Sequence, residues 1–176
     1  VVNHYRLDEL LVKHFGDRAG LVLDLASYMV VEGRNQGQYY PDYAYRHPLF
    51  SPGMRIYSDS TVSKFLSSVK DEQIAGFLND WNTDRDHKSR IYVSYDSTNK
   101  NCQAGDVDFV EFGKAKVDLG LPIFNVGLAM DQNNRIPLFY ELYPGSINDV
   151  SQFKFMVDKA VGYGSVSYTH LRAHET

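Results

Sequence analysis

The residue best placed to do chemistry is Asp96, which ends the strand-like segment 91–96 and is followed by Ser97. A carboxylate at the end of a buried strand is expected at the rim of a sheet, where a metal ion or a substrate can reach it. Mg²⁺ prefers oxygen ligands, often one or two carboxylates with waters and phosphate oxygens. Two such ions can clamp the attacking and leaving oxygens of a phosphoryl transfer. The alternative is structural, because an Asp that caps the turn after a strand is common.

Two other groups of residues are candidates for contact with nucleic acid. Lys114 and Lys116 could contact phosphate, although a solvated loop explains them equally well. The segment 32–57 mixes arginines with tyrosines, which could hold phosphates and stack on bases. We favour the other interpretation of 32–57, a long loop that its tyrosines fix to the core.

The elements of the first half, residues 1–90, are predicted to be helical. Apolar spacing predicts a helix from Leu7 to Phe15, and the nearly continuous apolar character of 18–31 predicts a buried helix. Glycines and prolines then mark 32–57 as a Tyr/Pro/Gly-rich loop.

Two further helices are expected before a polar linker at 82–90. The first spans 62–69, with its cap candidates among residues 58–60, and the second spans 74–81, with Asp71 as a candidate cap. These two helices could form a helix-turn-helix, but packing on the core is favoured because the second is not basic.

The second half, residues 91–164, changes from helical to strand-like periodicity. The predicted order is a strand at 91–96, a long polar excursion, strands at 123–131 and 136–143 joined by a turn, and a helix at 149–161. We expect one sheet of mixed polarity, with the second and third strands antiparallel and the helix packed on it. The expected fold class is therefore α/β or α+β, with an N-terminal helical region before the sheet.

Several segments of this second half resemble the bacterial insertion-sequence transposases of the DDE class. Tyr95-Asp96-Ser97-Thr98 is similar to their first-acid motif, and the strand order is that of the opening of a ribonuclease H-like fold. The segments 111–118 and 122–131 resemble the part of these transposases in which a Gly-x-Ser-Lys motif is followed by an Asp and then by a strand. Ala115 and Lys116 depart from the usual order of that motif. The segment 136–149 looks like the family's Pro-Leu…Pro-Gly-Asn-x-x-Asp stretch, with Ser146 where Asn is common.

The resemblance implies cleavage and joining of DNA strands at transposon ends, with three acids holding two Mg²⁺ or Mn²⁺ ions. Only the first acid corresponds to a residue of this sequence, Asp96, which would be both catalytic residue and metal ligand. The implied partners are transposon-end and target DNA and a second copy of the protein, in the bacterial cytoplasm. We expect the chain to be a fragment truncated at both ends, and inactive because the second and third acids lie beyond residue 164. We also expect 165–176, which resembles a translated sequencing adapter, to be a non-native tail.

Composition excludes several other classes. The chain has 176 residues, 43% of them apolar, and one cysteine, which excludes wholesale disorder and a disulfide framework. Residues 1–90 carry 11 Lys and Arg against 12 Asp and Glu, and 91–164 carry 6 against 9, so any DNA contact must come from a local patch. No apolar run reaches the roughly 18 residues of a membrane span. The alternatives to a transposase are a non-catalytic DNA-binding or interaction module and another ribonuclease H-like nuclease.

Overall fold

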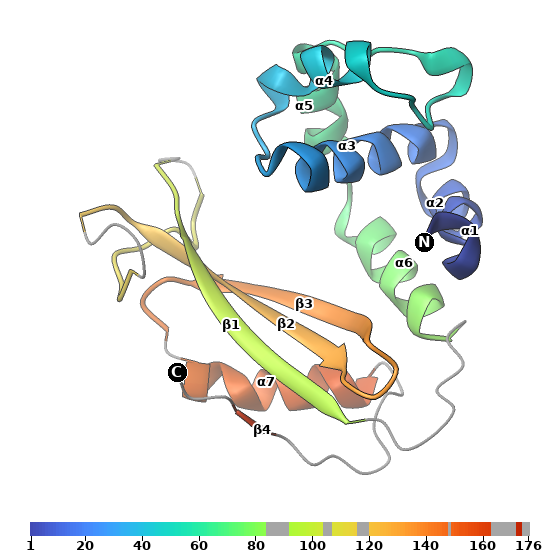
Figure 1. Ribbon diagram of the computed structural model, residues 1–176. Coiled ribbons are helices and arrows are strands. Elements are labelled where there is room, and N and C mark those ends of the chain that lie inside the picture. Colours follow the sequence, from blue (N-terminus) through green and yellow to red (C-terminus); the bar gives the residue numbers. More distant parts are fainter. Residues whose placement is uncertain (84–91, 104–106, 116–119, 148, 163–171, 174–176) are drawn as a thin grey trace. The chain divides into compact units, whose positions relative to one another are not determined.

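The computed structural model describes residues 1–83, 92–103, 107–115, 120–147, 149–162 and 172–173. It divides into two compact units, Val1–Trp81 and Asn82–Thr176. The described part of the first unit is helical, and that of the second is a sheet with one helix (Figure 1). The chain is therefore an α+β protein. Most of the predicted linker at 82–90 lies outside the described residues.

The helices of the first unit confirm most of the predicted ones. They are α1 (Val2–Tyr5), α2 (Leu7–Phe15), α3 (Ala19–Glu32), α4 (Tyr40–Arg46), α5 (Asp59–Ser68) and α6 (Asp71–Thr83), with 3₁₀ turns η1 (Gly16–Arg18), η2 (Gly37–Tyr39) and η3 (Pro52–Met54). The cap predicted before α5 is confirmed, because the Ser58 hydroxyl accepts a hydrogen bond from the Thr61 N–H. Asp71 is instead the first residue of α6, and the Gln73 side chain accepts from the Lys70 N–H.

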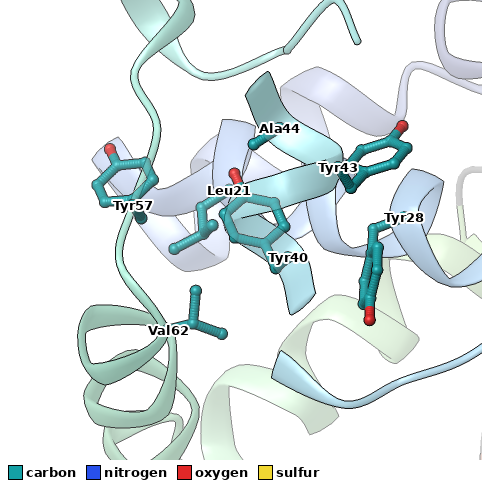
Figure 2. Close-up of a cluster of buried hydrophobic side chains, with 7 residues drawn as sticks. All are labelled: Leu21, Tyr28, Tyr40, Tyr43, Ala44, Tyr57 and Val62. Atoms are coloured by element: carbon teal, nitrogen blue, oxygen red, sulfur yellow. The ribbon is translucent and has the colours of Figure 1, made fainter. Parts of the chain in front are cut away.

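The prediction that 32–57 is a loop needs correction, because the segment contains α4. Pro41 stands in the first turn of this helix, where a missing N–H costs no helical hydrogen bond. Tyr40, Tyr43 and Ala44 share one face of α4 at helical spacing and are buried. They join a core cluster with α3, α5 and the segment before α5, made of Leu21, Tyr28, Tyr40, Tyr43, Ala44, Tyr57 and Val62 (Figure 2). The expectation that tyrosines fix this segment to the core is confirmed.

Helix α3 is less buried than its apolar sequence predicts. Leu21, Leu23 and Tyr28 are buried, but Val30 near the C-terminal end is 84% exposed, and Met29 and Val31 are exposed as well. The helices that contact α3 include α2 and α4, and they leave these last residues uncovered. A sequence that is apolar on all sides therefore does not guarantee burial on all sides.

The sheet of the second unit consists of β1 (Val93–Asn101), β2 (Ile123–Asp131) and β3 (Ile136–Pro144), with a two-residue β4 (Arg172–Ala173), in the order β3-β2-β1-β4. The first three strands are antiparallel, and β4 is parallel to β1. Helix α7 (Asp149–Gly162) follows β3 and runs along the sheet (Figure 1). The antiparallel pairing of the second and third predicted strands and the helix after them are confirmed.

The first strand is longer than predicted, since β1 continues past Asp96 to Asn101. Its register with β2 is unbroken over nine residues, from Val93 opposite Asp131 to Asn101 opposite Ile123. Pairing with an apolar central strand thus overrides the low strand propensity of the polar residues 99–101. Of the expected non-native tail, the structure describes Arg172 and Ala173, which pair with Ser94 and Tyr95. The other residues of 165–176 lie outside the described part.

Candidate active site

Asp96 lies in the interior of β1, with its side chain on the exposed face of the sheet. It stands opposite Leu128 of β2, which in turn stands opposite Tyr140 of β3, and all three residues are exposed. Because successive residues of a strand point to opposite faces, the row that includes the preceding residue Tyr95 faces the other way. That row, with Ala129 and Phe139, is buried.

Helix α7 identifies the covered face. The ammonium nitrogen of Lys159 on α7 lies 5.8 Å from the centroid of the Phe139 ring and forms an ion pair with Glu141 on the same strand. Met156 and Ala160, one helical turn apart, are buried. The helix therefore covers the face of the sheet that carries Tyr95. The Asp96 side chain lies on the opposite face, where it makes no hydrogen bond or ion pair with a described residue.

The expected position of Asp96 at a strand end is wrong, and so is the structural alternative in which it caps a turn. The strand continues for five residues beyond it. Within the described residues, the Asp96 carboxylate accepts no hydrogen bond and makes no ion pair. Both of its oxygens are therefore open to solvent or to a ligand, whereas a structural aspartate normally has its oxygens engaged.

One open carboxylate fits a single ligand position of a divalent ion. Across the described part of the chain, no three or more His, Cys, Asp or Glu side chains come together as a metal-binding group. Mg²⁺ bound by one protein carboxylate keeps several waters and depends on substrate phosphates for its other ligands. The described residues thus offer one ligand of a possible site and no more.

Of the two lysines that could contact phosphate or lie in a solvated loop, Lys114 is described and Lys116 lies outside the described residues. The Lys114 side chain is exposed and makes no ion pair with any described residue. Its carbonyl accepts a hydrogen bond of 3.0 Å from the Asn99 side chain of β1, and the next residue, Ala115, is buried. The loop that carries Lys114 is therefore attached to the strand that carries Asp96, and its charge is available to an anion.

The structure brings together the segments that carry the family resemblance. Glu111 forms a pair of backbone hydrogen bonds with Ile123, of 2.8 and 2.9 Å, and its carboxylate accepts a hydrogen bond from the Ser146 hydroxyl. The Asn125 amide donates to the carbonyls of Pro144 and Ile147, at 2.9 and 3.0 Å. These contacts hold the loop after β3 against β2.

Gly145 is required in that loop by close packing. A Cβ atom there would lie 2.4 Å from the Ile123 carbonyl oxygen, which is backbone and cannot move aside easily. Neither Asn125 nor Glu111 is predicted as a site residue from the sequence. Asn125 is a polar residue within the apolar run 123–130. Because a buried amide must find hydrogen-bond partners, this position could have indicated a structural contact.

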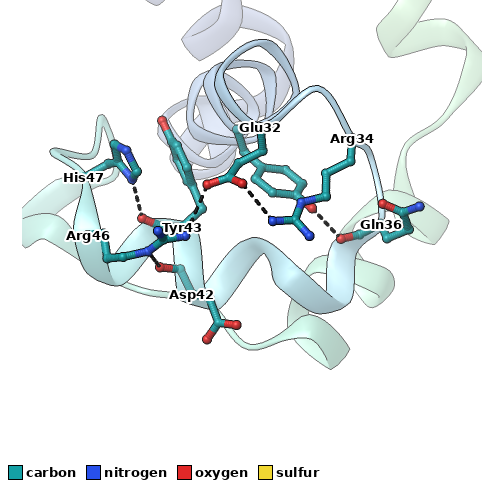
Figure 3. A network of polar contacts seen from close by, with 8 residues as sticks. Glu32, Arg34, Gln36, Asp42, Tyr43, Arg46 and His47 are labelled. Atoms are coloured by element: carbon teal, nitrogen blue, oxygen red, sulfur yellow. Dashed lines mark hydrogen bonds and ion pairs between the residues drawn. The ribbon is translucent and has the colours of Figure 1, made fainter.

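The Arg- and Tyr-rich segment 32–57 has little free charge at its start and at the end of α4. Arg34 and Arg46 both pair with Glu32, at 2.8 and 3.2 Å (Figure 3). The hydrogen bond from Arg34 lowers the pKa of the Glu32 carboxyl. Tyr43 stacks on His47 with ring centroids 4.2 Å apart. These contacts favour a structural role for the segment over contact with nucleic acid.

Comparison of the chain with protein-family models, with curated proteins and with solved structures gives no match. Within the described ranges, no helix has both the length and the apolar character that a membrane crossing needs. Asp96 is the candidate catalytic residue for two reasons. Its carboxylate is exposed and has no partner among the described residues, and the segment 95–98 resembles a first-acid motif.

Proposed function

We propose that this chain is part of an insertion-sequence DDE transposase and that its second unit begins a ribonuclease H-like catalytic domain. The observation that carries the proposal is the open carboxylate of Asp96 on the interior of β1. It stands in an antiparallel sheet of three strands, followed by a helix on the opposite face. The contacts among residues 111–147 support it further, because the segments that resemble the family pack on one another.

In this proposal Asp96 is the first of three acids that hold two Mg²⁺ or Mn²⁺ ions. The ions would stabilise charge on the attacked phosphate and on the leaving oxygen. Asp96 would supply one carboxylate ligand to the ions, and Lys114 would contact a phosphate of the DNA backbone. The other acids, the homodimer and the cytoplasmic location belong to the same proposal, as does the inactivity of the chain by itself.

The test is nicking of a DNA duplex that carries the sequence flanking the gene, chosen for any inverted repeat that this flanking sequence contains. It uses a form of the protein extended through the segments in which the resemblance expects the other two acids. Asp96→Asn is nearly isosteric, so folding and binding to the repeat should be retained. Loss of the anionic ligand should reduce Mn²⁺-dependent nicking by at least about a hundredfold, as expected for loss of electrostatic stabilisation at a reacting phosphate.

Asp158→Asn is the matched control, because it removes an exposed carboxylate from α7 of the same unit and should leave nicking unchanged. Equal nicking by wild type and Asp96→Asn would remove Asp96 from the site. Nicking that does not depend on the repeat would favour another ribonuclease H-like nuclease. Binding without nicking by any form would favour a non-catalytic module.

A further inference from the structure

A cavity of about 330 Å³ lies in the first unit between α5, the end of α2 with η1, and the start of α6. Its wall consists of Phe15 at the end of α2, Arg18 of η1, the face of α5 with Thr61, Lys64, Phe65 and Ser68, and then Val69 and Gln73. The four α5 residues follow the spacing i, i+3, i+4, i+7 and therefore share one face of the helix. The volume is at the lower end of the range for small-molecule sites.

The polar groups of this wall differ in what they can offer a ligand. The Gln73 amide already donates to the His14 carbonyl at 2.8 Å and accepts from the Lys70 N–H at 3.0 Å. The Ser68 hydroxyl donates to the Phe65 carbonyl at 2.7 Å. Within the described residues, neither Arg18 nor Lys64 has an ion pair. The two cations are therefore the groups left to recognise a ligand.

Two arginines lie over the same tyrosine ring, and one of them, Arg18, lines this cavity. The guanidinium carbon of Arg18 lies 5.1 Å from the centroid of the Tyr57 ring, and that of Arg55 lies 5.0 Å from the same centroid. The buried ring fixes Arg18 without neutralising it, because a cation–π contact leaves the charge in place. Arg55 also makes no ion pair with a described residue.

We propose that the cavity binds a small phosphate monoester that carries an aromatic or other apolar group. A phosphate monoester has a charge near −2 at neutral pH, which two cations match better than they match a carboxylate. Phe15, Phe65 and Val69 provide the apolar wall for the remainder of the ligand. A site for nucleic acid is less favoured, because DNA binding of useful strength requires more phosphate contacts than two cations provide. The proposal goes beyond the transposase function and does not depend on it.

The test is calorimetric titration of the intact chain with phenyl phosphate, with inorganic phosphate and phenol as comparison ligands. Phenyl phosphate should bind more tightly than either comparison ligand, because it alone uses both the cations and the apolar wall. Arg18→Gln and Lys64→Gln should each weaken its binding about tenfold, the effect of losing one charge-assisted contact. Both side chains are at least partly exposed, so folding should survive, and fluorescence of Trp81 checks this.

Lys70→Gln is the matched control, since it removes an exposed cation that does not line the cavity, and binding should be unchanged. The proposal is overturned if phenyl phosphate fails to bind, or if both charge variants bind it as wild type does. Binding of a short DNA duplex that is lost in Arg18→Gln, without binding of phenyl phosphate, would also overturn it and assign the cavity to a nucleic-acid backbone.

Discussion

Asp24, Asp96 and Asp131 have the same side chain but very different surroundings. Asp24 is 1% exposed and accepts hydrogen bonds from the Phe50 N–H, the Ser51 N–H and the Ser51 hydroxyl, at 2.6, 3.1 and 2.6 Å. Asp131 is buried and accepts from the backbone of the turn between β2 and β3. In both residues the carboxylate oxygens accept hydrogen bonds from backbone N–H groups and so fix the local chain. Asp96, exposed and without such a contact in the described part, is the one that retains coordinating capacity.

Replacement of Asp24 by Asn should destabilise the first unit by about 1–3 kcal/mol, the range for an unsatisfied buried polar group. The amide NH₂ would face a hydrogen-bond donor of Phe50 or Ser51 where a carboxylate oxygen now accepts. The measurement is urea unfolding followed by Trp81, the single tryptophan, which is 7% exposed and stacks on Phe77. Asp17→Asn is the control, because this carboxylate is exposed and makes no such contact with a described residue. Equal midpoints for the two variants would contradict the prediction.

At the scale of elements, prediction from sequence succeeded where apolar periodicity was strong. The segments 123–131 and 136–143 were recognised as strands, and α5, α6 and α7 as helices. The extension of β1 to Asn101 could not be predicted, because it depends on a partner strand more than twenty residues away. Helix α4 was missed because Pro41 suggested a break, although proline is compatible with a first turn. Because the extension of β1 was not predicted, Asp96 was expected at the end of its strand and not in its interior.

The contact between α2 and α6 should be sensitive to acid. Asp80 lies 2.6 Å from the Lys13 ammonium and 2.5 Å from the His14 imidazole, and the hydrogen bond from Lys13 lowers the pKa of Asp80 most. A carboxyl group whose folded pKa is lowered stabilises the fold above its unfolded pKa, about 4, and loses that contribution as the pH falls further. Between pH 6 and pH 3, the urea midpoint of wild type should therefore fall more than that of Asp80→Asn.

The control for this pH dependence is Asp71→Asn, which removes a carboxylate of the same helix that makes no ion pair with a described residue. Its midpoint should follow that of wild type across the range. Parallel pH curves for wild type and Asp80→Asn, read from Trp81 fluorescence, would show that the Asp80 contacts do not contribute to stability. Because Lys13 is well exposed, added salt should reduce the difference between the two proteins.

At the scale of the whole molecule, the chain combines two units with separate hydrophobic cores. The first has its tyrosine-rich cluster around α3 and α4 and a second cluster around Leu11, Ala19 and Leu23. The second has the α7 face of its sheet, with Tyr95, Ala129 and Phe139. A unit with its own core can fold alone in principle. The cavity beside α5 and the open carboxylate on β1 therefore lie in parts of the chain that can be studied one at a time.

A peptide of residues 1–83 should fold by itself, keep its helical circular dichroism and unfold cooperatively in urea. Its midpoint should be close to that of the first unit in the intact chain, because the clusters around Leu21 and around Leu11 lie wholly within residues 1–81. Trp81 emission characteristic of a solvent-exposed indole in the absence of urea would show that the helices need the second unit. A buried emission maximum, with the expected midpoint, would show that the core of four tyrosines and the packing of α2 on α6 are sufficient to hold the helical unit together.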